Sequence, residues 1–440
     1  MSKPVLGIQL EFGFHEVKKY IHSGFADKLA REFELVWFIL DKKNPEMDTY
    51  FRSTGYPVIY YQPENMQRPI HFCETCNDVV RRSWMRNQDA GLFHNYKRVA
   101  ASNWKDKLLG FRFLKHALEC KALWIVQRRY YHEQLALDFK KYNVQKVLST
   151  GYGSTFAKFF YTTAHHLNIP AYHIVNSWKD LYTNSFIGFD FLKKIFVWSE
   201  DMKLQYRQQM PYLKTTTLVP TGNPTFDACI THQPKAREVY CNKYNLHPNA
   251  HWVLYTMMPP GLVNDEWETI MTVAAEIDKF YTADQVKLIV RKNPNHTAED
   301  FTKVLLPNNV VVADHFCTYD AVTDMIIQSE EGEKEWLDLL HHATLNLSVP
   351  STVTMEFLTL KKPVINIGFD ATGNQDERVR QHFDAGFYRN LFDKEHVYRA
   401  TNIEALIPCL RRALEFNSLN TSHTAITLAS DRVLQELLND

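Results

Sequence analysis

The sequence lacks three features that would place a protein in a broad class at once: a net charge, a long apolar run and a repeated set of cysteine pairs. Lysine plus arginine and aspartate plus glutamate both number 50 among 440 residues, so the whole chain offers no net field for nucleic acid. No apolar run approaches the roughly 18 residues that a membrane span needs. The N-terminal apolar stretch, residues 5–10, is cut by Glu11 and is too short for a secretion signal.

Cysteine is also sparse, with seven residues scattered along the chain. Cys73 and Cys76 form one C-x-x-C pair, and no second pair follows to complete a zinc site. An odd, scattered set does not indicate a disulfide framework, and a reducing compartment is the simpler account. We therefore expect a cytoplasmic protein, with peripheral contact at the inner face of the membrane as an option.

The length of the chain, its composition and its alternating patterns are those expected of a two-domain α/β protein. Hydrophobic residues make up 45% and charged residues 23%, and 440 residues exceed one ordinary core. Short apolar runs alternate with helical patterns, which indicates parallel sheets covered on both faces. The runs that we interpret as strands are residues 5–10, 35–40, 58–61, 147–149, 171–175, 195–197 and 217–219, followed by 253–256, 287–291, 310–312, 344–347 and 364–367.

The domain boundary is expected at residues 228–250. The segment from Val219 to Pro224 ends a strand in turn residues, and a short helical pattern then leads to a new strand. We predict an N-terminal α/β acceptor domain over 1–227 and a C-terminal α/β donor domain over 251–440. In open parallel sheets, ligands bind beyond the carboxyl ends of the strands, so two such domains would face a cleft.

A basic segment interrupts the first domain. Residues 78–143 have almost no strand signal and are expected to form a helical insertion, and within 81–129 twelve Lys or Arg face three acidic residues. Aromatic residues are interleaved with the charges. The segment is either a solvated helical insertion or a surface for an anionic partner, such as an acidic glycan, a lipid-linked acceptor or a membrane face. Nothing in it matches an RNA-binding signature, so we expect no nucleic-acid partner. The candidate anion-binding residues are Arg81, Arg82, Lys97 and Arg98.

Residues 343–367 form the stretch around which the second domain is organised. A short strand, a turn at residues 348–350, a helix and a second strand opened by Pro363 follow one another. Ser351 or Thr352 is a suitable N-cap, and Lys361 and Lys362 are expected to close the helix at its negative end. Ser and Thr are common at helix starts for capping alone. A helix N-terminus with free N–H groups also attracts phosphate.

The same stretch resembles a known donor-binding motif. Ser351-Thr352, then Glu356, then Lys362-Pro363-Val364-Ile365 is similar to the motif of GT-B glycosyltransferases of the CDP-glycerol and Kdo transferase type, with the UDP-N-acetylglucosamine 2-epimerases as relatives. The resemblance implies two doubly wound, Rossmann-like domains facing a cleft. It also implies that Ser351, Thr352 and Glu356 bind a nucleotide-sugar donor.

A second segment, residues 288–296, resembles the R-x-H-P segment of the CDP-glycerol-type enzymes, which meets nucleotide phosphate. Asn293 stands where that pattern has histidine, so a histidine role there is not carried over. Arg291 and Lys292 keep the charge that neutralises a diphosphate, and we include both in the expected donor site. A surface basic pair at a strand end is the alternative.

The reaction also needs an acid–base group for the acceptor hydroxyl. The loop after the first strand often holds it in GT-B enzymes, and here that loop offers Glu11 and His15 as catalytic candidates. The glycine-rich turn 151–155 is a further candidate for the ligand-facing edge. No Asp-x-Asp occurs in the chain, so we expect no metal site, and no cofactor apart from the nucleotide sugar as substrate.

The sequence thus predicts a glycosyltransferase of surface polysaccharide or glycoconjugate synthesis, acting on a glycan or lipid-linked acceptor. Two alternatives stay open. One is a sugar-nucleotide epimerase on the same fold, although residues 350–353 lack both glycines of the epimerase version, Ser-Gly-Gly-x-x-x-Glu. The other is a non-catalytic glycan- or membrane-binding protein that has kept the fold.

Overall fold

The structure is a computed structural model of the 440-residue chain. It describes residues 2–440 apart from 12–13, 41–44, 67–75, 77–111, 152–153, 179, 184–188, 261–262, 264, 294–295, 297–304, 315–316, 321–324, 375–378, 380–382, 384–387, 389–395 and 417–426.

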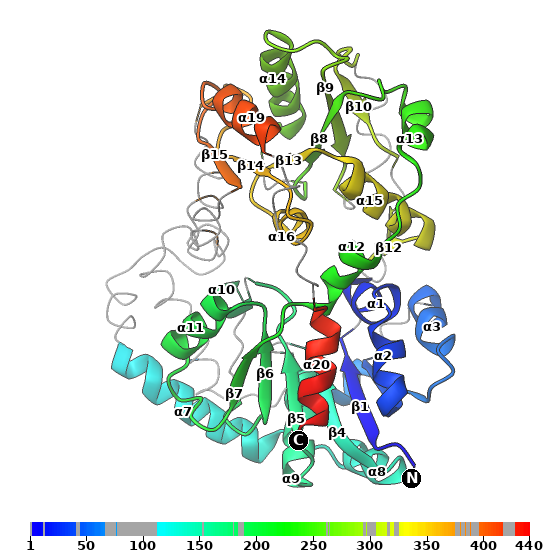
Figure 1. Ribbon diagram of the computed structural model, residues 1–440. Helices are drawn as coiled ribbons and strands as arrows, with labels where there is room; N and C mark the ends of the chain where they lie inside the picture. The colour runs from blue at the N-terminus through cyan, green and yellow to red at the C-terminus, as the bar shows by residue number, and fades with distance from the viewer. Residues whose placement is uncertain are drawn as a thin grey trace. The chain divides into compact units, whose positions relative to one another are not determined.

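The described residues divide into two compact units. Those up to Asp227, together with Thr427–Asp440, form unit 1, and those from Ala228 to Ile426 form unit 2. Each unit is built on its own parallel sheet (Figure 1). The two-domain α/β fold expected from the alternating pattern is therefore confirmed.

Unit 1 contains a seven-stranded parallel sheet in the order β3-β2-β1-β4-β5-β6-β7. Its strands are β1 (Val5–Leu10), β2 (Glu34–Leu40), β3 (Val58–Tyr61), β4 (Val144–Ser149), β5 (Ala171–Ile174), β6 (Lys194–Val197) and β7 (Thr217–Pro220). The strand order reverses between β1 and β4, which pair side by side with Gln9 opposite Ser149. This reversal is the topological switch point, at which doubly wound sheets bind ligands.

Helices cover both faces of the unit 1 sheet. They are α1 (Phe14–Val17), η1 (Lys18–His22), α2 (Phe25–Glu32), α3 (Pro45–Arg52), η2 (Pro63–Met66), α7 (Arg112–Arg129), α8 (Glu133–Lys141), α9 (Thr155–His166), α10 (Asp180–Thr183), α11 (Glu200–Gln209), η3 (Pro224–Phe226) and α20 (Ala429–Leu438). Successive β2 residues serve opposite faces, because side chains alternate along a strand. The Phe38 ring centre lies 5.4 Å from that of Phe160 of α9, whereas Trp37 packs 5.5 Å from Tyr20 of η1.

Unit 2 has a six-stranded parallel sheet in the order β10-β9-β8-β13-β14-β15 and a separate hairpin. The strands are β8 (His251–Thr256), β9 (Val286–Arg291), β10 (Val310–Val312), β13 (Leu345–Ser348), β14 (Val364–Ile367) and β15 (Val397–Ala400), with β11 (Cys317–Asp320) and β12 (Met325–Gln328) in the hairpin. Its helices are α12 (Asp227–Thr231), α13 (Arg237–Tyr244), α14 (Glu266–Asp278), α15 (Glu330–His342), α16 (Thr352–Thr359) and α19 (Leu406–Glu415). The hairpin and β15 were not predicted from the sequence.

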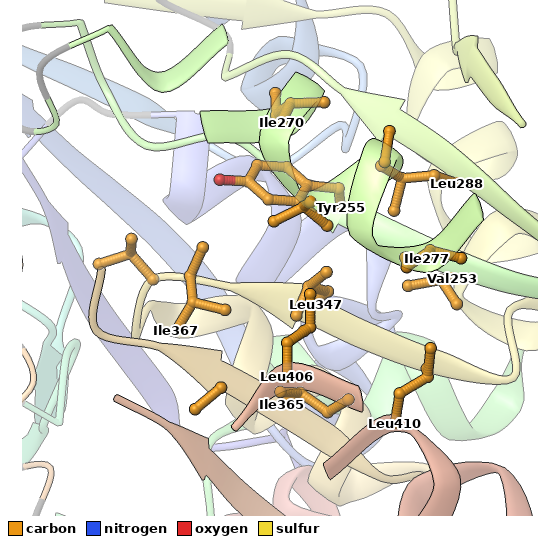
Figure 2. Close-up of a cluster of buried hydrophobic side chains, with 14 of the residues drawn as sticks. Val253, Tyr255, Ile270, Ile277, Leu288, Leu347, Ile365, Ile367, Leu406 and Leu410 are labelled. Atoms are coloured by element: carbon orange, nitrogen blue, oxygen red, sulfur yellow. The ribbon is translucent and has the colours of Figure 1, made fainter. Parts of the chain in front are cut away.

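Alternation along the central strands gives unit 2 a core on each face of its sheet. Val253 and Tyr255 of β8 pack with residues of α14 and α19, including Ile270 and Leu410 (Figure 2). The intervening residues Trp252 and Leu254 pack on the other face with α13, α15 and α16. Both faces of β8 are thus apolar, which is why its sequence is a continuous apolar run.

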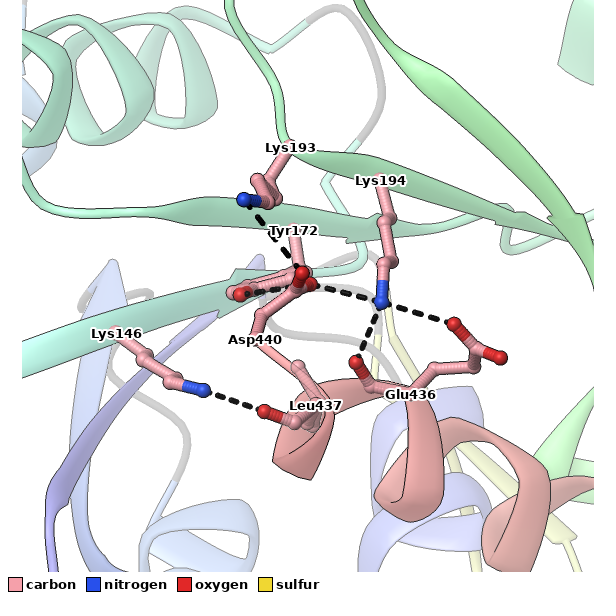
Figure 3. A network of polar contacts seen from close by, with 7 residues as sticks. All are labelled: Lys146, Tyr172, Lys193, Lys194, Glu436, Leu437 and Asp440. Carbon is pink, nitrogen blue, oxygen red and sulfur yellow. Dashed lines mark hydrogen bonds and ion pairs between the residues drawn. The ribbon is translucent and has the colours of Figure 1, made fainter.

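The C-terminal helix differs from the expected domain division. Residues 251–440 are all expected in the second domain, but α20 packs in unit 1. Lys194 of β6 binds the carboxylates of Glu436 and Asp440 at 2.9 and 2.8 Å (Figure 3). At the other end of the helix, the Asp227 carboxylate accepts the N–H groups of Ala429 and Ser430 at 2.9 and 2.8 Å. Contacts at both ends of α20 thus secure it to unit 1.

The basic segment is described only in part. Residues 112–143 form α7 and α8, in agreement with the predicted helices, and 77–111 lie outside the described residues. Not all of its charges face solvent, because Lys115 is buried and pairs with Glu119 at 3.1 Å. Within the described part of the chain, no helix has both the length and the apolar character that a bilayer span requires.

Candidate functional site

The carboxyl edge of the unit 2 sheet carries the first candidate site. β8 and β13 are neighbours there, but the helices that follow them, α14 and α16, pack on opposite faces of the sheet. The chain therefore leaves β8 and β13 towards opposite faces, and this pair of strands is the topological switch point, the position at which open α/β sheets bind ligands. The motif that resembles a donor-binding site, residues 351–356, lies on the loop after β13 and on α16.

A buried polar network holds the loop after β13. The side-chain amide N–H of Asn346 donates to the Thr256 hydroxyl at 3.2 Å. The Ser348 hydroxyl donates to the side-chain oxygen Oδ1 of Asn346 at 2.9 Å. The Asn366 amide donates to the Thr354 hydroxyl at 3.2 Å. Hydrogen-bonded polar groups inside a core fix one arrangement, because breaking any bond would leave a buried group unsatisfied. The network thus joins β8, β13, β14 and α16 where the loop begins.

The N-terminus of α16 is only partly satisfied by the protein. Ser351 occupies the N-cap position in an extended conformation, but its hydroxyl caps no N–H group and has no hydrogen-bond partner among the described residues. Thr352 begins the helix and is exposed. The preceding carbonyl of Pro350 accepts the Tyr388 hydroxyl at 2.6 Å, which fixes the turn. An anion placed here would meet the Ser351 hydroxyl and helix N–H groups that the Ser351 side chain does not cap.

Lys362 has a different role from the one expected. Its ammonium group does not close α16 but donates to the carbonyls of Leu340, His341 and Ala343, at the C-terminus of α15. Burial, with a smaller effect of nearby Arg237, lowers the pKa of Lys362 to about 7. Three carbonyls at the negative end of a helix offset part of that burial. The lysine of the motif is therefore a helix cap for α15.

Arg291 and Glu356, both predicted donor-site residues, meet at one tryptophan. The Arg291 guanidinium carbon lies 4.3 Å from the centre of the Trp336 ring, and the Trp336 indole N–H donates to the Glu356 carboxylate at 3.4 Å. Arg291 and Glu356 are partly exposed, whereas Trp336 is buried. Lys292, the next residue after Arg291, is also buried and is not the surface residue that the alternative interpretation supposed.

The loop after β8 is fixed by a buried carboxyl group. Both oxygens of Glu266, at the start of α14, accept the Met258 N–H at 3.0 and 3.1 Å, and the Tyr255 hydroxyl donates at 3.3 Å. The His296 ring nitrogen Nε2 lies 3.1 Å from the Met258 carbonyl oxygen. Burial raises the pKa of Glu266 to about 8, although the hydrogen bonds from Met258 and Tyr255 oppose the shift. The Glu266 carboxyl group therefore keeps its proton to a higher pH than an exposed glutamate does.

Unit 1 has a second candidate site at its own switch point. Glu11 follows β1, and its backbone N–H donates to the Glu16 carboxylate at 2.9 Å. The same carboxylate oxygen accepts the Thr150 hydroxyl, after β4, at 3.0 Å. A Cβ added at Gly151 would lie 2.5 Å from a Glu11 carboxylate oxygen, so only glycine lets Glu11 occupy this position. Glu16 thus joins the two loops, and Gly151 makes room for Glu11.

Further ionisable groups lie behind these loops. Lys19 is buried, and its ammonium group donates to the Asn176 side chain at 2.5 Å. Burial lowers the pKa of Lys19 to about 8, against the attraction of Glu16 and Asp180. Burial, helped by the charge of Lys19, lowers the pKa of His173 to about 3, so this histidine is neutral at physiological pH. The edge of the unit 1 sheet therefore combines carboxylates, a lysine and a neutral histidine.

The other predicted site residues are placed less completely. His15 belongs to α1, but its side chain lies outside the described residues, as do Arg81, Arg82, Lys97 and Arg98. Among the residues that are described, no three His, Cys, Asp or Glu side chains gather as a metal-binding group.

Sequence reasoning missed residues that the site depends on. Trp336 lies inside a helical pattern and gave no signal for a role at the site. Asn346 and Asn366 did give one, because each is an amide in the middle of an apolar strand, where an unpaired polar group is costly. Glu16 was not considered, although it lies five residues after Glu11 in the same loop region.

Solved structures support the fold assignment. The UDP-N-acetylglucosamine 2-epimerase of Methanocaldococcus jannaschii, in complex with UDP-GlcNAc and UDP, matches with a TM-score of 0.53 at 12% identity, over 99% of this chain and 99% of that one. The enzyme of Neisseria meningitidis bound to UDP-GlcNAc matches with a TM-score of 0.51 at 14% identity, over 99% and 100%. No protein-family model and no curated protein matches the chain. The GT-B-type fold that the motif implied is confirmed.

Proposed function

We propose that the protein is a nucleotide-sugar-dependent glycosyltransferase that works without a metal ion. It would transfer a sugar, or a polyol phosphate, to a glycan or lipid-linked acceptor in surface polysaccharide or glycoconjugate synthesis. The observation that carries the proposal is the meeting of Arg291 and Glu356 at the carboxyl edge of the unit 2 sheet, on either side of Trp336. A cation and a carboxylate that both contact one tryptophan suit the diphosphate and the hydroxyl groups of a nucleotide sugar.

Unit 2 would hold the donor. The uncapped N-terminus of α16 and the Arg291 guanidinium supply positive charge to the diphosphate, whose negative charge increases as it leaves. When the donor is a nucleoside diphosphate sugar, the acceptor oxygen forms a bond to the anomeric carbon. The bond from that carbon to the diphosphate oxygen breaks, and its electron pair leaves with the nucleoside diphosphate. Glu356 would accept hydrogen bonds from donor hydroxyls.

Unit 1 would hold the acceptor and take its proton. Glu11 lies at the β1–β4 switch point, where Glu16 holds its backbone and Gly151 leaves space for its side chain. We propose the Glu11 carboxylate as the group that receives the acceptor hydroxyl proton, with His15 as the alternative base. Replacement of Glu11 by Gln should lower turnover while nucleotide binding by unit 2 is kept, because the amide cannot take a proton.

The epimerase alternative is favoured by the solved structures, which include epimerases bound to UDP-GlcNAc. It is opposed by the sequence Pro350-Ser351-Thr352-Val353, which lacks the two glycines of the epimerase motif. The reactions differ in their products. An epimerase converts the sugar nucleotide without an acceptor, whereas a transferase releases nucleoside diphosphate in proportion to the acceptor glycosylated.

The deciding experiment has two stages. Thermal-shift screening against UDP, CDP, GDP, CMP and their sugars identifies the nucleotide, since a ligand at one hundred times its Kd stabilises by about 2.7 kcal/mol. Chromatography of the products, with and without candidate acceptors, then separates transfer from epimerisation. The Glu356→Gln variant is the control for the thermal-shift stage, because the proposed donor site should bind the nucleotide less tightly without this carboxylate. A wild type that responds to no nucleotide would overturn the proposed function and favour a binding protein.

We further propose that α7 contacts an anionic membrane surface that carries the acceptor. Phe113 is 84% exposed and Trp124 is 44% exposed on its outer side, and Lys121 and Arg128 both stack on the Trp124 ring at 4.2 Å. Aromatic rings at the interface with neighbouring cations suit anionic lipid head groups. We also keep Arg81, Arg82, Lys97 and Arg98 as candidate anion-binding residues on the basis of their sequence alone.

A further inference from the structure

We infer that Trp336 positions Arg291 and Glu356 for one ligand, so that a single indole sets the spacing between the phosphate-binding cation and the hydroxyl-binding carboxylate. The inference rests on the proposed donor role of unit 2 and adds a residue to it. Trp336 is a positioning residue in this account, because it acts through its two neighbours.

The geometry links three separate elements through one side chain. Arg291 ends β9, Trp336 lies in the second turn of α15, and Glu356 lies in the second turn of α16. Trp336 is only 4% exposed and packs in the core between these elements and β8. The Arg291 guanidinium lies over the face of the ring, and the Glu356 carboxylate accepts a hydrogen bond from the ring N–H. A rigid bicyclic ring fixed in a core is therefore in contact with both groups.

The stack orients Arg291 without using its donors. A guanidinium lying on an aromatic ring interacts through its flat face, so the N–H groups on its edge keep their fork geometry for an anion. Arginine alone has large rotamer freedom, and stacking removes part of that freedom before a ligand arrives. On the other side, the indole N–H takes one of the roughly four acceptor positions of the Glu356 carboxylate and sets its direction.

A second tryptophan shows what a purely structural stack looks like in the same unit. Arg237 lies 3.7 Å from the centre of the Trp252 ring. Its guanidinium also donates to the carbonyls of Pro248, Ala250 and His342, at 3.0, 2.7 and 2.7 Å. Those hydrogen bonds use the N–H groups of Arg237 on backbone carbonyls. Within the described residues, the Arg291 guanidinium makes no hydrogen bond to a backbone carbonyl. Trp252 is therefore the matched control for Trp336.

The test compares UDP with uridine in the full-length protein, using Kd values from calorimetry or competition. The gain of UDP over uridine reports the phosphate contact, and uridine alone reports the contact to the ribose hydroxyls. In Trp336→Phe the ring remains and the N–H is lost, so both ligands should weaken by a similar factor, about three- to tenfold. In Trp336→Leu the ring is lost as well, and the gain of UDP over uridine should itself fall about tenfold. Trp252→Phe should change neither quantity.

Arg291→Lys replaces Trp336→Leu if the larger change prevents folding, because lysine keeps the charge without the flat fork. Equal loss of both ligands in every Trp336 variant, or a loss in Trp252→Phe of the same size, would overturn the positioning role. A double-mutant cycle of Trp336→Phe with Glu356→Gln, read by unfolding, tests the pair without nucleotide. If Trp336 and Glu356 are coupled in unfolding but the wild type binds no nucleotide, the proposed function is wrong and the contact between the two residues stands. If unfolding shows no coupling between them, the contact itself is wrong.

Discussion

Ser351 can now be tested as a ligand-binding residue free of a helix-capping effect. Its hydroxyl sits at the N-cap of α16 but makes no capping bond, and its buried oxygen has no partner among the described residues. Removing such a hydroxyl should leave the unfolding free energy within about 0.5 kcal/mol of the wild type. If the hydroxyl binds donor phosphate, Ser351→Ala should weaken nucleotide binding by about 0.5–1.5 kcal/mol.

Ser329→Ala is the matched control for Ser351→Ala. The Ser329 hydroxyl does cap its helix, since it accepts the Gly332 N–H at 3.0 Å at the start of α15. Its loss should lower the unfolding free energy by about 1 kcal/mol and leave nucleotide binding intact. Urea unfolding and nucleotide titration of both variants make the comparison. Equal destabilisation by the two would show that Ser351 caps α16 after all.

Glu266 should make the stability of unit 2 depend on pH. Its pKa rises from an ordinary value near 4.5 to about 8 in the folded state, mainly because of burial. Between these two values the unfolded chain has released a proton that the folded protein still binds. The contribution of Glu266 is therefore fully present below pH 4.5 and is lost as the pH rises towards 8. Glu266→Gln should remove this part of the slope in melts between pH 5 and 8.5, and an unchanged slope would contradict the assignment.

The position of an individual candidate residue in the fold is predictable only when the sequence itself places it at a strand end or a helix start. Glu11, Arg291 and Ser351 satisfy that condition, because each follows or ends an apolar run. Trp336 does not, since its role depends on contacts with residues 45 positions before it and 20 after it. Lys362 was assigned to the wrong helix for the same reason, because its carbonyl partners come from the end of α15.

At the scale of elements, the exposed side of α7 yields a prediction about membranes. Changing Lys121 and Arg128 to Ser should weaken binding to vesicles that contain phosphatidylglycerol by roughly thirtyfold, at about 1 kcal/mol per charge near the surface. Added salt should weaken the wild type in the same way, because exposed charges are screened over about 8–10 Å. Co-sedimentation measures both effects.

Two controls accompany the α7 variant. Lys140 and Lys141 are exposed cations of the neighbouring helix α8, and their replacement by Ser removes the same charge from another surface. Phe113→Ser with Trp124→Ser removes the aromatic rings and keeps the charge. We expect the first control to bind like the wild type and the second to bind more weakly at all salt concentrations. Binding that ignores salt and all three variants would leave α7 as a structural helix.

Strands with a mainly apolar sequence are predictable, whereas short strands that mix polar and apolar residues are not. Residues 58–61, 310–312 and 364–367 have the bounds that the sequence predicts, because each is a short run made mainly of apolar or aromatic residues between polar or turn residues. β15 has the sequence Val-Tyr-Arg-Ala, and the hairpin strand β11 ends in Tyr-Asp, so neither has an apolar pattern of its own. Their pairing partners, and not their local sequence, make them strands.

At the scale of the whole molecule, Asp227 is the residue on which the placement of the C-terminal helix depends. Its carboxylate caps α20 across the sequence, at 2.9 and 2.8 Å to two backbone N–H groups. Asp227→Ala should lower the unfolding free energy of unit 1 by about 1–3 kcal/mol, and Asp227→Asn by less, because the amide keeps one acceptor. Protection of α20 amides in hydrogen exchange should fall in parallel. Nucleotide binding should stay unchanged, and a loss of it would contradict the assignment of donor binding to unit 2.

The apolar periodicity of α20 does not determine which unit the helix joins. Its apolar residues Val433 and Leu437 suit any apolar surface, and the choice is made by distant partners: Asp227, Lys194 and Lys146. Contacts of such long separation leave no local signature, so the return of the chain to unit 1 is not predictable from the sequence around α20.

The return of α20 has a consequence for biosynthesis. Because unit 2 is encoded inside unit 1, a ribosome completes unit 2 before it makes the helix that unit 1 needs. Until then the nascent unit 1 exposes Lys146, Lys194 and the Asp227 carboxylate without their helix, and it must wait while about two hundred residues are translated, at roughly 5–20 residues per second. Translation arrested before residue 427 should therefore leave an N-terminal portion that proteases digest and a middle portion that resists them.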